Sequence, residues 1–163
     1  MGEYTVIFVT VGTHHLSFDR LLSFVDDLIK LKKIKEEVVI QSGTSTIRVT
    51  GAIQKATYDF NEFINLLKKA RLVISHAGPA TIYQSIVLAG KIPIVVPRLK
   101  KHGEHVSDHQ LYFARELEKE NKIYLSLSKK DLDQQLTNFK SQKVAWTKST
   151  TINPRLKSFL DSI

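Results

Sequence analysis

The chain has 163 residues, with 24 Lys or Arg against 16 Asp or Glu, so its formal net charge is +8 at pH 7. This length fits one domain that can bury a core without covalent staples. The sequence has no cysteine, which excludes disulfides, thiolate-bound zinc, iron–sulfur clusters and cysteine nucleophiles. A reducing cytoplasm is the simplest expected compartment.

No apolar run approaches the roughly 20 residues that a membrane-spanning helix needs. The first ten residues include Glu3 and no basic residue, so we expect a first strand there and no signal peptide. The positive charge favours an anionic partner, which is a nucleic acid, an acidic lipid surface or a phosphorylated ligand. Charge alone does not choose among these three.

Short β-branched runs alternate with amphipathic stretches, which is typical of βαβ units and a parallel sheet. Strands are predicted at residues 4–11, 38–41, 56–60, 72–75, 92–96 and 123–125, and helices at 18–33, 61–69, 81–88, 106–120 and 128–139. Residues 44–55 are predicted to be a loop or a short edge strand. The pattern indicates an α/β fold with a Rossmann-like, doubly wound and mostly parallel sheet over residues 1–139, followed by a C-terminal appendage at 140–163.

Helix starts carry local signals. Asn61 is expected to cap its helix, and Ser128 with Asp131 resembles a capping box. Pro79 stands where a helix begins, a position at which its missing N–H costs nothing. Asp131 and Asp133 also spell D-x-D, a metal-binding pattern of sugar transferases, but capping and helix-dipole roles explain both acids better.

Two segments follow predicted strands and have the composition of phosphate-binding turns. Gly12 permits close backbone approach and Thr13 supplies a hydroxyl, although a tight strand–helix turn explains the pair equally well. The second segment, residues 75–81, combines Ser75 and His76 with small residues before a helix start. We favour a phosphate site there over ordinary close packing, because two polar residues at a strand end are otherwise an odd choice.

The third segment, residues 97–110, concentrates basic, acidic and histidine side chains in one loop and one helical turn, which is typical of a binding loop. His105 and His109 have the spacing of two metal ligands on one helix face. His102 lies before Gly103 and is expected off that helix, so no clear third ligand remains and a metal site is disfavoured. The aromatic residues form no stacking platform for single-stranded nucleic acid.

Four motifs occur in a specific order. They are VTVGT at 9–13 with FDRL at 18–21, ISHAGP at 74–79, GKIPIVVP at 90–97 and GEHVSDHQ at 103–110. Over about residues 5–125 the chain resembles the glycosyltransferase family 28 C-terminal domain. It looks most like the small, separate catalytic subunits that pair with a membrane-associated partner. These include bacterial capsule and exopolysaccharide subunits and the eukaryotic subunit that adds the second GlcNAc to dolichol-linked sugar.

The resemblance implies a single GT-B half that binds a UDP-sugar donor. By position in the motifs, the diphosphate-binding residues would be Gly12, Thr13, Gly78, Pro79, Ala80 and Thr81. The nucleoside-binding residues would be Phe60, Gln84 and His76, and the sugar-binding residues Glu104, His105, Asp108, His109 and Gln110. Gln84 stands where many relatives place a Glu that holds the ribose, which implies weaker donor affinity. The family implies no metal and no other cofactor.

The implied reaction is an inverting transfer of a hexose (galactose, glucose or GlcNAc) from UDP-sugar to a polyprenyl-diphosphate-linked sugar, undecaprenyl-linked in the bacterial branch. It would serve surface polysaccharide biosynthesis at the inner face of the plasma membrane. A membrane-associated partner subunit would supply the acceptor site, and His14 is the candidate base within this chain. The alternative is a non-catalytic UDP-sugar-binding or activator subunit, which Gln84 favours. Nucleic-acid binding rests on charge alone and ranks third.

Overall fold

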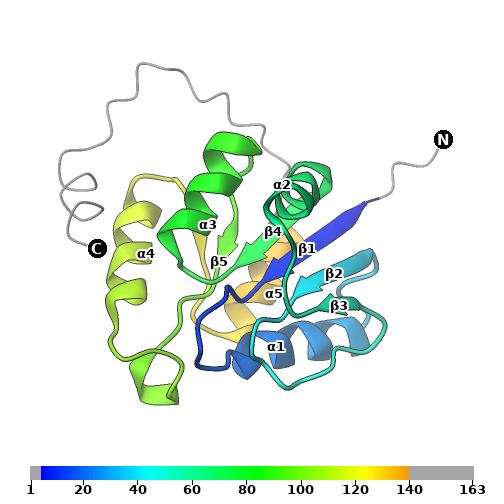
Figure 1. Cartoon of the computed structure of the whole chain (residues 1–163), viewed down its shortest axis with the longest axis horizontal. Coiled ribbons are helices and arrows are strands. Elements are labelled where there is room, and N and C mark those ends of the chain that lie inside the picture. The colour runs from blue at the N-terminus through cyan, green and yellow to red at the C-terminus, as the bar shows by residue number, and fades with distance from the viewer. Residues whose placement is uncertain (1–4, 140–163) are drawn as a thin grey trace.

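The computed structural model describes residues 5–139, which form one parallel sheet flanked by helices on both faces (Figure 1). The strands are β1 Val6–Thr10, β2 Glu37–Gln41, β3 Ile53–Lys55, β4 Leu72–Ser75, β5 Ile94–Val95 and β6 Tyr124–Leu125. The helices are α1 Asp19–Lys30, α2 Phe60–Lys69, α3 Pro79–Tyr83, α4 His109–Lys119 and α5 Lys129–Asn138. A π-helical turn, Gln84–Leu88, continues α3, and a 3₁₀ turn, Lys100–His102, precedes α4.

The strand order is β3-β2-β1-β4-β5-β6, and every neighbouring pair is parallel. The chain builds outward from β1 to β3, then crosses back to β4 and builds outward in the other direction. The loops after β1 and β4 therefore lie side by side at the carboxyl edge of the sheet. In doubly wound sheets this reversal is where ligands bind.

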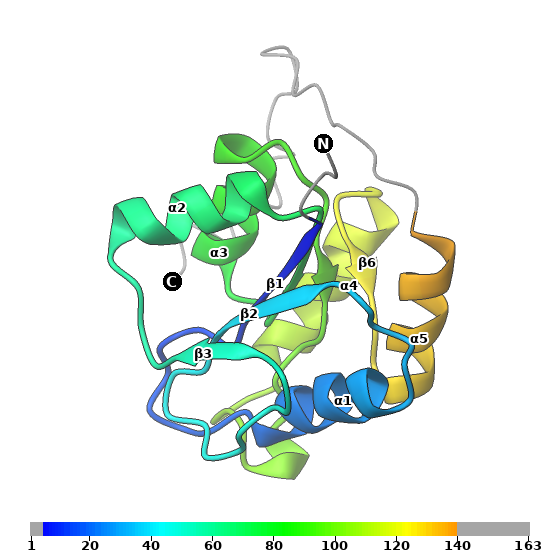
Figure 2. The same ribbon diagram turned by 90° about the vertical axis from the view of Figure 1, so that its right-hand side faces the viewer.

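Each face of the sheet has its own apolar core because alternate strand residues point in opposite directions. On one face, Ile7 and Val9 pack with Leu21 of α1 and Leu132 of α5. On the other face Phe8 packs against α2, and Val95 packs against α3 and α4. Figure 2 shows α1 and α5 together on one side of the sheet and α2 and α3 on the other. The predicted Rossmann-like fold is confirmed, and the sheet of the described residues is wholly parallel.

The prediction of a strand at residues 56–60 was wrong. The edge strand is β3, which pairs Ile53 with Val39, and Phe60 already belongs to α2. Asp59 rather than Asn61 caps this helix: its carboxylate accepts the Glu62 N–H at 2.8 Å, and the Glu62 carboxylate accepts the Asp59 N–H at 3.3 Å. This capping box satisfies two helix-start donors at once, which favours Asp59 over its neighbour.

The helix predicted from residue 106 begins at His109 instead. Ser107 donates its backbone N–H to the His105 ring, and the Asp108 carboxylate accepts the Lys100 N–H at 2.9 Å. These local bonds compete with helix formation.

Other local predictions are confirmed. Ser128 and Asp131 form the expected capping box, and Pro79 is the first residue of α3. Within residues 5–139 no helix is long and apolar enough to cross a membrane. The predicted appendage at 140–163 lies outside the described residues.

Candidate functional site

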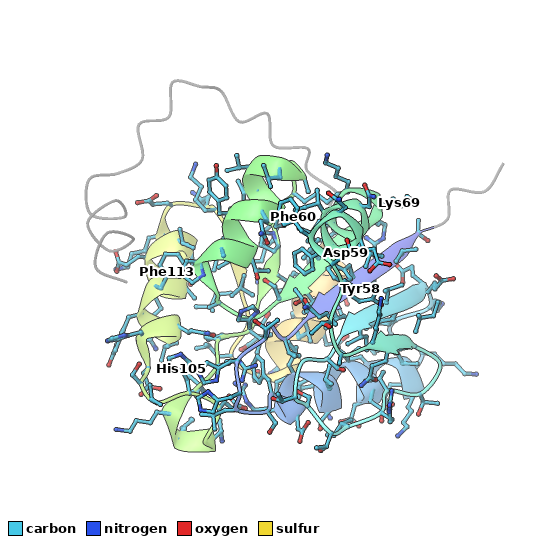
Figure 3. The ribbon with its side chains drawn as sticks, viewed as in Figure 1. Tyr58, Asp59, Phe60, Lys69, His105 and Phe113 are labelled. Carbon is cyan, nitrogen blue, oxygen red and sulfur yellow. The ribbon has the colours of Figure 1, made fainter. Side chains whose placement is uncertain are left out.

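A cleft of about 440 Å³ opens at the carboxyl edge of the sheet, where the loops after β1 and β4 meet. Its walls come from the first loop, the end of β2, the start of α2 and the start of α3. The lining residues are Gly12, Thr13, Gln41, Tyr58, Phe60, Phe63, His76, Gly78, Pro79, Ala80, Thr81 and Gln84. The cleft thus brings together every residue predicted for the diphosphate and for the nucleoside. Figure 3 shows Tyr58 and Phe60 beside the start of α2 and His105 well apart from them.

Two glycines and one histidine form the floor of this cleft. A Cβ at Gly12 would stand 2.5 Å from His76 Nε2, and a Cβ at Gly78 only 2.2 Å from the same atom. Both distances are far below any normal contact, so the imidazole fits only because neither neighbour has a side chain. Gly12 also has φ +76°, a conformation that glycine adopts without strain. We name His76, Gly12 and Gly78 the glycine–histidine cradle.

The His76 ring is neutral in this environment. Its side chain is buried, and burial lowers its pKa to about 3, with the Arg98 guanidinium contributing in the same direction. Its Nδ1 is buried and makes no hydrogen bond of good geometry within the described residues, although the Thr10 backbone raises the pKa slightly against these two effects. The ring atom that lies nearest to Gly12 and Gly78 is Nε2, so Nε2 is the nitrogen that the cradle presents.

The start of α3 presents free backbone donors to the same cleft. Gly78 is its N-cap, no side chain caps it, and Pro79 occupies the first helical position. The N–H groups of Ala80 and Thr81 have no partner within the helix, because the first turn of any helix lacks acceptors. Such a helix start, together with a close-approaching glycine turn, favours an anionic group.

The opposite end of the cleft is aromatic. Tyr58, Phe60 and Phe63 line it, and Phe60 is 62% exposed although it is a large apolar residue. An exposed aromatic ring at a cleft mouth can stack on a planar ligand group. Gln84 begins the π-helical turn on the facing wall, and such turns are frequent at functional sites.

Sequence reasoning missed Gln41, Tyr58 and Phe63. Gln41 ends β2, and its Oε1 accepts the Thr10 hydroxyl at 2.7 Å. That bond leaves the amide NH₂ available at the cleft wall. A polar residue at the carboxyl end of a buried parallel strand was the available signal for Gln41.

The residues predicted to bind the sugar do not line the cleft; they lie on the loop after β5 and at the start of α4. Glu104 is only 4% exposed. Its carboxylate accepts Arg20 Nε at 2.8 Å and the Leu99 N–H at 2.9 Å, so this side chain holds the loop against α1. The Asp108 carboxylate accepts the Lys100 N–H, and the Gln110 side-chain oxygen accepts the Arg98 N–H. His109 is exposed.

Arg98 is the structural anchor that sequence reasoning missed. It is 1% exposed, and its guanidinium donates to the carbonyls of Val11 and Leu16 at 2.7 Å and of Glu104 at 3.1 Å. Burial lowers its pKa to about 10 while Glu104 opposes the shift, so Arg98 stays charged at neutral pH. Rather than facing an anionic ligand, it fixes the first loop to the loop after β5.

Three histidines stack beside this anchor. The His14 ring lies 4.4 Å from the ring of His15 and 4.9 Å from that of His105, both nearly parallel. His105 precedes α4, so the two-ligand helical geometry with His109 is not formed. Across residues 5–139 no group of three or more side chains is arranged to hold a metal ion.

Comparisons with known proteins agree with this architecture. The model of the glycosyltransferase family 28 C-terminal domain matches residues 6–162. The chain belongs to this family. It is also 30% identical over 127 residues to the human UDP-N-acetylglucosamine transferase subunit ALG13. This alignment covers 72% of this chain and 11% of ALG13.

Two solved structures share the fold of this family 28 domain. The kitacinnamycin glycotransferase superposes with a TM-score of 0.58 at 13% identity, over 97% of this chain and 37% of that one. MurG of Acinetobacter baumannii superposes with a TM-score of 0.56 at 17% identity, over 83% of this chain and 41% of that one. The described fold is therefore that of one GT-B half, and the chain spans less than half the length of these relatives.

Proposed function

We propose that this family 28 domain is the donor-binding, catalytic subunit of an inverting hexosyltransferase that uses UDP-sugar. The observation that carries the proposal is that a glycine–histidine cradle, an uncapped helix start and an aromatic wall adjoin in one cleft. These three parts match the diphosphate and the uridine of such a donor. The transferred hexose is galactose, glucose or GlcNAc.

In this proposal the diphosphate lies over Gly12 and Thr13 and against the free N–H groups of Ala80 and Thr81. The neutral His76 ring would add one hydrogen bond through Nε2, the ring atom nearest to Gly12 and Gly78. The helix start and these donors offset the charge that grows on the UDP leaving group, so no metal cofactor is required. Uracil would stack at Phe60, and the ribose hydroxyls would bond to Gln84.

The hexose would extend towards β5, where His105, Asp108, His109 and Gln110 lie. Glu104 would support this side indirectly, because its carboxylate already holds Arg20 and Leu99. In the transfer step the acceptor hydroxyl oxygen bonds to the anomeric carbon as the bond to UDP breaks, which inverts that carbon.

The acceptor side would come from a second subunit. The support for this is that its human relative is named as a transferase subunit. We propose a membrane-associated partner that binds the polyprenyl-diphosphate-linked sugar, undecaprenyl-linked in a bacterium, for capsule or exopolysaccharide synthesis. The chain would then sit on the cytoplasmic face of the membrane through that partner, and its +8 charge would favour both UDP and an anionic leaflet.

A transfer assay tests this proposal against the alternative of a non-catalytic subunit. The chain is co-expressed with its partner, and transfer of radiolabelled sugar from each UDP-sugar to undecaprenyl-diphosphate-linked sugar is measured. Ala80→Asp places a negative charge at the exposed start of α3, where it repels a diphosphate. We expect transfer to fall at least about tenfold. Undiminished transfer would favour the activator role, in which donor binding by this chain is dispensable.

A further inference from the structure

His14 has a fixed hydrogen-bonding pattern that bears on how the proposed transferase handles protons. The backbone N–H of Leu16 donates to His14 Nδ1 at 3.2 Å. A neutral imidazole has one acceptor nitrogen and one N–H, so Nδ1 is the acceptor and Nε2 carries the proton. In this tautomer Nε2 can donate a hydrogen bond but has no lone pair with which to accept a proton.

The surrounding structure holds the ring in this orientation. His15 and His105 stack against it, which opposes rotation of the imidazole plane. The Thr44 hydroxyl lies 3.2 Å from the His14 carbonyl, and Arg98 bonds the Leu16 carbonyl at 2.7 Å, so both ends of the short loop are tied. Freeing Nδ1 would require breaking the Leu16 bond and leaving this stack.

The electrostatic surroundings keep His14 uncharged. Partial burial lowers its pKa, and Arg98, His15 and His105 lower it further in that order. At pH 7 the ring is therefore a neutral donor. The structure gives Nε2 no hydrogen-bond partner within residues 5–139, so this one donor remains free for a ligand.

The position of His14 indicates which ligand group it meets. His14 follows Thr13 of the cleft wall and contacts His105 on the loop after β5. With uridine at the Phe60 end and diphosphate over β1 and β4, a donor's hexose extends to this β5 side. We propose that His14 binds a hydroxyl oxygen of the transferred hexose through Nε2–H, and that it does not act as the base. The inference rests on the proposed function, and it replaces the sequence-based assignment of His14 as base candidate.

The proton balance then involves the partner subunit. The acceptor O–H loses its proton as its oxygen bonds to the anomeric carbon, while the leaving UDP oxygen takes the electron pair of the broken bond. In our proposal a carboxylate or imidazole of the acceptor-binding subunit takes the proton. His14 only orients the hexose for that attack.

Nitrogen-15 NMR of the imidazoles in the full chain tests the tautomer without any ligand. Comparison with a His14→Gln sample assigns the signals of this ring. We expect a neutral ring at pH 7 with the proton on Nε2. A proton on Nδ1 would overturn the inference, whatever the outcome for the proposed function.

Binding of UDP and of UDP-hexoses to three variants tests the role. Gln can place an amide N–H near the position of imidazole Nε2, whereas Ala cannot, and His102→Gln is an exposed histidine control. We expect His14→Ala to weaken binding of the preferred UDP-hexose about 3- to 10-fold and binding of UDP less than about twofold. His14→Gln should bind both ligands with affinities close to those of the wild type. Equal UDP-hexose binding by wild type, His14→Ala and His14→Gln would overturn the inference alone. Absence of UDP binding by the wild type would contradict the proposed function instead.

Turnover of the assembled transferase separates a donor from a base. A base role predicts that His14→Ala and His14→Gln both lose about 100-fold or more in kcat and lose the acidic limb of the pH profile. We expect His14→Gln to keep kcat within about threefold of the wild type and to keep that limb. A loss of both in His14→Gln would overturn the inference.

Discussion

Gly78→Ala tests the glycine–histidine cradle most sharply. Gly78 has φ −77°, which any residue adopts, so the substitution carries no backbone strain. Its new Cβ would stand 2.2 Å from His76 Nε2, 2.9 Å from Cδ2 and 3.0 Å from Cε1, which forces a buried ring to move. Overpacking of this kind costs about 1–3 kcal/mol, and the loss of glycine's unfolded-state entropy returns about 0.4–1 kcal/mol. We expect a net loss of about 1–2 kcal/mol, or about 2–8 °C in Tm.

A double-mutant cycle with His76→Ala isolates the clash. In the His76→Ala background the Gly78→Ala cost should fall below about 0.5 kcal/mol, a coupling of about 1–2 kcal/mol. Gly103→Ala is the matched control, because Gly103 has φ +67° and nothing within 4 Å of its Cβ position. Its cost is strain alone and should not depend on His76. Urea unfolding of the wild type, the two single variants and the double variant measures the cycle. An unchanged Gly78→Ala cost in the absence of the His76 ring would refute the reasoning.

The structure makes three further predictions. Because the pKa of His76 falls from 6.5 unfolded to about 3 folded, its stabilising contribution is complete above about pH 6.5 and declines as pH falls towards 3. At pH 5 the free energy of unfolding should be about 2 kcal/mol lower than above about pH 6.5 because of this group. Urea unfolding should show this loss for the wild type and not for His76→Gln. Parallel pH profiles for the two proteins would contradict the prediction. Gln84→Glu should strengthen UDP binding about fivefold through a charge-assisted ribose bond, and calorimetry should show no such gain with 2′-deoxy-UDP. Arg98→Met leaves buried carbonyls unpaired, so it should lower Tm by at least about 6 °C in a thermal melt; a smaller drop would mean that Arg98 is not the anchor of the first loop.

The fold was predictable wherever local signals agree with the tertiary structure. The apolar runs of β1 and β4 predict buried parallel strands, and the Ser128–Asp131 capping box is a purely local device. The start of α2 was not predictable in this way. Its cap at Asp59 depends on where β3 ends, and β3 is set by pairing with β2 rather than by its own three residues.

The site was predictable in part for the same reason. Glycine turns and a helix start are visible in the sequence, so Gly12 and Gly78 could be named. Their shared contact with His76 exists only because the sheet brings two distant loops together. Arg98 is one of several basic residues in its segment of the sequence, and only the folded loops show that its guanidinium donates to backbone carbonyls.

The central claim, that the cleft binds the UDP part of a donor without a metal, is tested most directly by calorimetric titration of UDP into the full chain in EDTA. The variant Ala80→Asp adds a negative charge at the second position of α3, where an acid does not harm the helix. Lys130→Gln lowers the net charge by the same amount at the second position of α5, away from the cleft. We predict one UDP per chain for wild type and Lys130→Gln, with at least about tenfold weaker binding by Ala80→Asp. No binding at millimolar UDP, or equal binding by all three, would contradict the account.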